Sequence, residues 1–446
     1  MDARDSVAGN QPPPITDQQV LIGTIEAIWR IESAKIIARL ARIVRDVGVA
    51  EELAQDALII AMEQWPHDGV PHNPAAWIMT TAKHRAIDRI RRNVVLERKV
   101  EELGRELVIE EELAARDFDS GIDEIDDDLL KLIFTACHPV LSTEARVALT
   151  LRLLGGLTTD EIARAYLVPE PTIAQRIVRA KRTLSDMQVP FEIPDNVTRL
   201  ERLASVLEVI YLIFNEGYTA TAGKDWMRPA LCEEALRLGR ILAQLMPPEP
   251  EVHGLIALME IQASRMRARV GPTGEPILLL DQNRARWDHL LIQRGLTALR
   301  RAEALDHTLG TYTLQAAIAA CHARARSAEE TEWTRIAALY AQLGVLTPSP
   351  IIELNRAVAV SMADGPAAGL EIIDALRASP ALKRYHLLPS VRADLLVRLG
   401  RHQEAYIEFM QAAQLTQNTR ERELLLRRAA TAKALSSNNS APLLRR

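Results

Sequence analysis

The sequence has little of several residue types that define other classes of protein. Only three of its 446 residues are cysteines, Cys137, Cys232 and Cys321, and they lie too far apart to form a disulfide framework or a short metal motif. Aromatic residues make up 4% of the chain. No apolar run approaches the ~20 residues of a membrane span, and the first residues lack the charged-then-apolar layout of a secretion signal. We therefore expect a protein of the reducing cytoplasm that does not enter the membrane.

The sequence also lacks the short motifs of the common enzyme classes. It contains no GxxxxGK[ST], HExxH, GxSxG or CxxC. His67 and His72 flank a loop, but their spacing matches no recognised metal motif. We therefore expect no catalytic residue, no metal and no cofactor, although an enzyme is the main alternative from a different class.

Alanine, leucine and arginine are plentiful, in a chain that is 48% hydrophobic and carries a net charge of −5. This mixture favours helices over sheets, so the predicted fold class is all-α. A chain of 446 residues forms more than one domain. Because the chain as a whole is acidic, any nucleic-acid surface must be local.

Charge changes abruptly near residue 100. Residues 81–99 have a net charge of +5 and residues 101–128 have a net charge of −11. Such an acidic block is typical of a solvated linker or a weak helix. The predicted organisation is a disordered tail (1–16), a helical domain (17–96), an acidic linker (97–127), a second helical domain (128–189), a helical repeat-like domain (190–435) and a second disordered tail (436–446).

The last third of the chain has repeat character. Residues 393–415 read ADLLVRLGRHQEAYIEFMQAAQL, which resembles a tetratricopeptide helix pair. A weaker copy, NRAVAVSMADGPAAGLEIIDAL, occupies residues 355–376, and a third possible unit lies at 333–344. We therefore predict stacked helices in which each repeat packs on its neighbours.

Residues 158–184 read TTDEIARAYLVPEPTIAQRIVRAKRTL and predict two short helices around a tight turn. Thr158 and Glu161 have the T-x-x-E spacing of a capping box, which begins the first helix. That helix ends before Leu-Val-Pro, since the residue before a proline avoids the α region. Pro171 suits the first turn of the second helix. The pattern predicts a helix-turn-helix, the alternative being a surface helix with a solvated charged face.

The second helix of this pair has two distinct faces. Apolar side chains recur at helical spacing on one face: Ile173, Ile177, Ala180 and Leu184. Candidate base-reading side chains share the neighbouring face: Thr172, Gln175, Arg176 and Arg179. Lys181 and Arg182 suit phosphate contacts. The helix therefore has the residues that DNA recognition requires.

The same stretch resembles region 4 of bacterial sigma factors, in particular the extracytoplasmic-function group, in which this helix reads the −35 promoter element. DEIA, VP, PT, QRIVRAK and TL fall in register with the family pattern. Leu167 stands where the family usually has glycine, so we expect the turn to close without a residue at positive φ. Ala174 replaces a longer polar residue and removes one possible base contact.

Two upstream stretches resemble region 2 of the same family. AEELAQDALIIAMEQW is similar to the helix that docks on the clamp of the polymerase β′ subunit, and the resemblance implies Glu52, Gln55 and Asp56 as contacts. PAAWIMTTAKHRAIDRIRR is similar to the segment that opens the −10 element, with His84 in place of the usual Asn. Trp77 is either a base contact or plain core. The implied −10 contacts are Trp77, Lys83, His84, Arg85, Arg89, Arg91 and Arg92.

The remainder resembles the branch of these sigma factors that has a long helical extension, on the stretches LIFNEGYTATAG, HGLIALMEIQASRMRAR and ILLLDQNRARWD. The resemblance implies core RNA polymerase and promoter DNA as partners, regulation by the extension, and a small YCII-like protein as a possible further partner. The alternative is a helix-turn-helix regulator with a helical-repeat sensor that does not bind polymerase. Charged residues among apolar ones in the extension form either partly buried ion pairs or a small-ligand pocket: Glu216, Asp281, Arg284 and Arg286.

Overall fold

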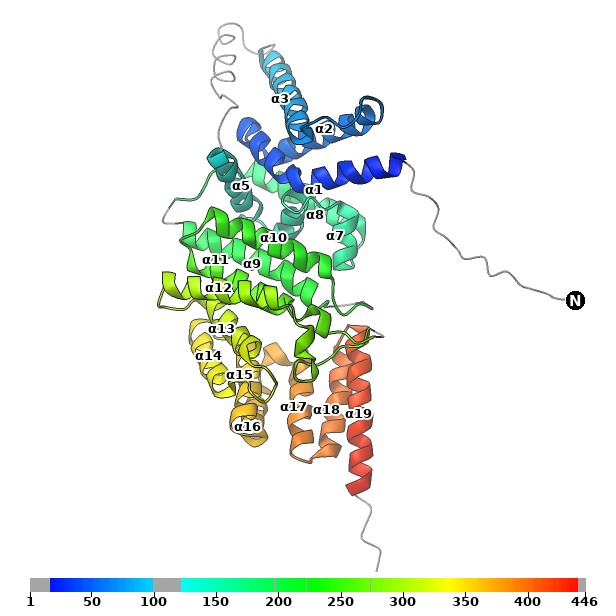
Figure 1. Ribbon diagram of the computed structural model, residues 1–446, viewed down its shortest axis with the longest axis vertical. Helices are drawn as coiled ribbons and strands as arrows, with labels where there is room; N and C mark the ends of the chain where they lie inside the picture. Colours follow the sequence, from blue (N-terminus) through cyan, green and yellow to red (C-terminus); the bar gives the residue numbers. More distant parts are fainter. Residues whose placement is uncertain (1–16, 99–121, 196–197, 222, 273, 440–446) are drawn as a thin grey trace, which may run out of the picture. The chain divides into compact units, whose positions relative to one another are not determined.

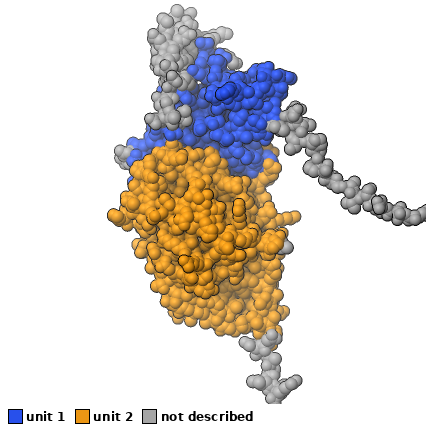
Figure 2. Space-filling view, in the orientation of Figure 1, with its two compact units in different colours: residues 1–162, 171–202 blue, residues 163–170, 203–446 orange. Residues whose placement is uncertain are grey.

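The computed structural model describes residues 17–98, 122–195, 198–221, 223–272 and 274–439. Within these residues the ordered elements are helices, and β-type pairing is limited to two isolated bridges. The chain divides into two compact units, unit 1 (1–162 and 171–202) and unit 2 (163–170 and 203–446), which Figure 2 colours separately. None of the helices in the described part combines the length and the apolar character that a membrane span needs. The all-α prediction is confirmed.

Unit 1 begins with helices that pack on one another: α1 (Asp17–Val44), α2 (Val47–Asp68), α3 (Pro74–Arg98) and α5 (Ile122–Ala136). The Asp46 carboxylate accepts from the backbone N–H groups of Gly48 (2.7 Å) and Val49 (2.9 Å), which explains why α2 begins there. α2 continues through Pro66 and ends at Asp68, so His67 lies in the last turn of the helix. α5 begins at Ile122, six residues before the helical pattern recognised from Asp128.

The helix-turn-helix is made of α7 (Thr159–Tyr166) and α8 (Glu170–Asp186), and α6 (Thr143–Leu153) precedes it. The capping box is confirmed, because the Glu161 N–H donates to Thr158 Oγ1 (3.1 Å) and the Thr158 N–H donates to the Glu161 carboxylate (2.8 Å). The expectation that the turn closes without positive φ is wrong. Leu167 has φ +52°, because the Val168 N–H bonds back to the Ala163 carbonyl (3.1 Å), a closure that needs a left-handed residue.

Unit 2 is a succession of helices in which most pack on the next helix in the chain, and α11 packs on both α12 and α13 (Figure 1). Their bounds are α9 (Arg199–Tyr218, of which residues 203 onward belong to this unit), α10 (Pro229–Leu245), α11 (Pro250–Ala263), α12 (His289–Leu305), α13 (Thr311–Arg324), α14 (Trp333–Leu346), α15 (Pro350–Ala363), α16 (Pro366–Leu376), α17 (Leu387–Arg398), α18 (His402–Leu415) and α19 (Thr419–Asn439). Short 3-10 turns lie between some of them: η1 (Met266–Ala268), η2 (Leu279–Asp281), η3 (Arg284–Arg286) and η4 (Pro380–Leu382).

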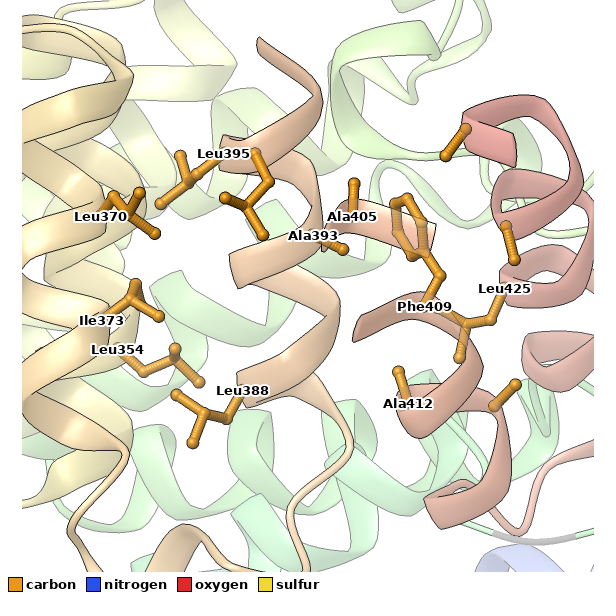
Figure 3. Close-up of a cluster of buried hydrophobic side chains, with 14 of the residues drawn as sticks. Leu354, Leu370, Ile373, Leu388, Ala393, Leu395, Ala405, Phe409, Ala412 and Leu425 are labelled. Atoms are coloured by element: carbon orange, nitrogen blue, oxygen red, sulfur yellow. The ribbon is translucent and has the colours of Figure 1, made fainter. Parts of the chain in front are cut away.

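The predicted repeats are helix pairs with a shared core. The strongest repeat forms α17 and α18, which turn at Gly400 with φ +74°, and the weaker one forms α15 and α16. Figure 3 shows Ile373 of α16 and Phe409 of α18 among the side chains of this core. α15 and α16 approach closely at Gly369, where an added Cβ would lie 2.5 Å from Ser361 Cβ. A stack of this kind buries apolar area between successive helices rather than around one centre.

Candidate nucleic-acid interface

The second helix of the helix-turn-helix, α8, has the two faces that the sequence predicts. Its apolar stripe is buried: Ile173, Ile177, Ala180 and Leu184. Thr172, Gln175 and Arg179 are exposed and Arg176 is half-buried. The helix is therefore held by one side and presents hydrogen-bonding side chains on the other, as base reading in the major groove requires.

The exposed face of α8 forms one wall of a groove of about 430 Å³, and the segment that leads into α6 forms the other. Glu144 lies in this groove. Its own backbone N–H and the Ser142 hydroxyl, followed by the Arg176 charge, lower the pKa of the Glu144 carboxyl. Arg176 therefore has a carboxylate close by. Arg179 has no carboxylate within ion-pair distance among the described residues, so its guanidinium has more donors left for a base edge.

The two cations predicted for phosphate differ in their surroundings. The Lys181 ammonium is paired with Glu51 of α2, and only 20% of the lysine side chain is exposed. Arg182 is 80% exposed and makes one pair within its own helix, to Asp186 at 3.3 Å. In this arrangement Arg182 is accessible to a phosphate, whereas Lys181 is engaged inside the protein.

Glu51 is a site residue that the sequence reading missed. It is 2% exposed and also binds Arg152 of α6, with Nε 2.5 Å from the carboxylate. One buried carboxylate thus joins α2, α6 and α8 within unit 1. Helical spacing places Glu51, and not Glu52, on the buried face of α2 with Val47 and Ala54. Its cationic partners lie 101 residues away or more, so spacing alone does not reveal the contact.

The predicted polymerase contacts and the predicted −10 contacts face one another. Asp56 of α2 pairs with Arg85 of α3 at 2.8 Å, and Glu52 pairs with Arg89 at 3.1 Å. All four side chains remain more than two-fifths exposed. Gln55 turns inward and donates to the Glu51 carboxylate. Exposed pairs of this kind are worth about 0–1 kcal/mol each, so a strong partner can replace them.

The other predicted −10 residues lie along α3. Trp77 is half-buried and meets Trp65 edge to face, with ring centroids 5.5 Å apart. Lys83 is half-buried, and His84 and Arg91 are exposed. The side chain of Arg92 lies outside the described residues. The edge contact gives Trp77 a packing role, and its partial exposure leaves one surface of the ring accessible.

Comparison with protein families assigns these regions. Residues 30–94 match Sigma-70 region 2, and residues 131–184 match Sigma-70, region 4. Residues 202–303 match a family of unknown function (DUF6596). An uncharacterised protein of Rhizobium meliloti (strain 1021) is 41% identical over 392 residues, which span 86% of this chain and 89% of that protein.

Two named sigma factors match about a third of this chain. The ECF RNA polymerase sigma factor SigK of Mycobacterium ulcerans (strain Agy99) is 28% identical over 158 residues, which span 34% of this chain and 78% of SigK. SigK of Mycobacterium bovis (strain BCG / Pasteur 1173P2) is 28% identical over 159 residues, with the same coverage. The chain is an extracytoplasmic-function sigma factor with a helical extension. Core RNA polymerase and promoter DNA are the partners of this family, and its members are not enzymes.

We predict that removing the Glu51 carboxylate loosens unit 1 of the sigma factor. Glu51→Ala should lower the free energy of local unfolding of α8 by about 3 kcal/mol, because two largely buried cations lose their shared partner. The matched change Glu52→Ala breaks an exposed pair and should cost less than about 1 kcal/mol. Native-state amide hydrogen exchange in α8 measures both values. Equal protection of α8 in the two variants would contradict a special role for Glu51.

Proposed function

We propose that this sigma factor docks on the clamp of the polymerase β′ subunit through α2, opens the −10 element with α3 and reads the −35 element with α8. The observation that carries the proposal is the exposed face of α8: Gln175 and Arg179 point outward from a helix whose other face is buried. Gln pairs with adenine and Arg with guanine in the major groove. The matches to sigma regions 2 and 4 support the order of the three contacts along the chain.

The two exposed ion pairs between α2 and α3 fit a protein that exchanges internal contacts for external ones. Glu52 and Asp56 are proposed to leave Arg89 and Arg85 when the clamp binds, and the two arginines then become available to DNA phosphates. Because each exposed pair is worth little, the exchange costs little. The same contact would thereby couple polymerase binding to promoter melting.

We expect charge reversal on α2 to abolish binding to core polymerase. In the double variant Glu52→Arg, Asp56→Arg the clamp contact loses two carboxylates and gains two repelling charges. The control variant is Asp127→Arg, which reverses an exposed carboxylate in α5. Co-purification with core polymerase and run-off transcription from the promoter of the protein's own operon are the measurements. Retained co-purification in the double variant, with an unchanged helical circular dichroism spectrum, would refute docking through this face.

A second prediction separates base reading from phosphate contact on α8. Arg179→Ala should weaken holoenzyme binding to the cognate −35 element by about 5- to 150-fold, the usual worth of 1–3 kcal/mol for a bidentate base contact. Binding to random DNA should change far less. Arg182→Ala is the matched control in the same helix and should weaken both DNAs alike. If Arg179→Ala also weakened both equally, Arg179 would be a phosphate contact.

The helical extension is proposed to regulate the sigma core, with a small YCII-like protein as the candidate partner that the family resemblance implies. Unit 2 is a stack of helices, and such stacks present extended surfaces suited to proteins or peptides. We expect truncation after residue 190 to lose transcription while core-polymerase binding, the check on folding, persists. Equal transcription by the truncated and full-length proteins, in cells and in vitro, would end the regulatory proposal.

A further inference from the structure

Unit 2 contains a ladder of alternating arginine side chains and aromatic rings, in the order Arg269, Tyr218, Arg265, Trp287, Arg284. The Arg269 Cζ lies 3.5 Å from the centre of the Tyr218 ring. The Arg265 Cζ lies 5.9 Å from the Tyr218 ring and 5.8 Å from the Trp287 ring. The Arg284 Cζ lies 4.9 Å from Trp287. Each ring therefore lies between two guanidinium groups, and we call this set the arginine–aromatic ladder.

The two outer arginines of the ladder bind acceptors inside the protein. Arg269 donates to the Tyr218 carbonyl, and Arg284 donates to the His322 carbonyl at 2.6 Å. Carbonyl oxygens satisfy N–H groups without neutralising the charge. Burial, together with the charges of Arg265 and Arg284, lowers the pKa of His322 to about 3. The imidazole is therefore neutral at physiological pH, and the ladder retains the three guanidinium charges.

Arg265, at the centre of the ladder, has no such acceptor. The residue is 8% exposed, and its Nε is buried without a hydrogen-bond partner. Among the described residues its side chain makes no hydrogen bond and no ion pair, and it contacts the Tyr218 and Trp287 rings. A guanidinium group carries five N–H donors and a full positive charge. A buried charge with neither a counter-ion nor acceptors is costly to maintain.

Other buried arginines of unit 2 have carboxylate partners. Arg392, which is 7% exposed, binds both Asp374 and Glu408 at 2.7 Å. Arg228 is paired with Glu216. The sequence left open whether Glu216 belongs to an ion pair or to a ligand pocket, and the structure places it in an ion pair. The fold thus supplies carboxylates to other guanidinium groups of the unit, and the charges of Glu329 and Glu330 act on Arg284 at one end of the ladder. Arg265, at the centre, forms no ion pair with the described residues. An anion from outside the protein would give Arg265 the partner that it lacks there.

We propose that Arg265 binds the carboxylate or phosphate group of a small anionic molecule, with Arg269 and Arg284 adding to the attraction. Both groups present two oxygen atoms at the spacing that a guanidinium fork binds. An anion there would use the idle donors of Arg265 and relieve the repulsion among three neighbouring cations. The inference concerns binding alone and stands without the regulatory role proposed above.

The test follows thermal unfolding of the full-length protein in sodium phosphate, in sodium citrate and in sodium chloride of matched ionic strength. We expect phosphate or citrate to raise the unfolding temperature beyond the effect of chloride, since a ligand of the folded state stabilises it by mass action. The two anions separate phosphate from carboxylate recognition. Arg265→Gln should lose this extra rise. In chloride its unfolding temperature should equal or exceed that of the parent, because an unpaired buried charge is gone.

Two controls distinguish the ladder from other cationic surfaces. Arg377→Gln removes an exposed positive charge from the same unit and should keep the anion-dependent rise. Arg179→Ala removes a cation from the DNA-reading face and should also keep it. The proposal is overturned if neither anion raises the unfolding temperature more than chloride does. It is also overturned if Arg179→Ala removes the anion-dependent rise and Arg265→Gln does not. It is equally overturned if Arg265→Gln unfolds at a lower temperature in chloride and keeps the anion response, which is the signature of a packing role.

Discussion

Unit 1 depends on one buried carboxylate. Glu51 is 2% exposed and joins α2 to Arg152 of α6 and to Lys181 of α8. A carboxylate at that depth is tolerable only with its cations in place, so the positions of the three helices are linked. The exposed faces of α2 and α8 follow from that link, because each helix turns its other side inward. The Lys181 ammonium is then engaged inside the protein, so the proposed contact with DNA would use the other side chains of the α8 face.

The local features of this arrangement can be read from sequence, and the long-range ones cannot. The capping box at Thr158 and the buried stripe of α8 depend on residues a few positions apart, so spacing alone predicted them. Leu167 was mispredicted because leucine disfavours positive φ, yet the helix ending requires that conformation and the side chain can stay in solvent. Glu51 and Glu52 are adjacent identical residues. Helical spacing puts Glu51 on the buried face of α2, but its cationic partners lie more than a hundred residues away, so the sequence does not reveal that contact.

The helical extension shows the same division between local features, which the sequence predicts, and long-range contacts, which it does not. Small residues at a helical spacing and the L-G turn between two helices predicted the α17–α18 pair, because both are local consequences of close packing. The arginine–aromatic ladder was not predicted. Its members come from the end of α9, from the segment after α11 and from η3, and no repeat pattern connects these irregular segments. Arg284 was noted as one of several charged residues, but its place beside Trp287 is a property of the folded chain.

Burial separates the ion pairs that hold this protein together from those available for exchange. The contacts of Glu51 with its two cations are shielded from water, and breaking them leaves charges that the interior cannot solvate. The Glu52 and Asp56 pairs with α3 lie in water, where solvent replaces a lost partner at little cost. The exchange proposed for this subunit needs both kinds. In that proposal the exposed pairs give up their partners to a new surface, while the buried carboxylate keeps the helices that carry those side chains in place.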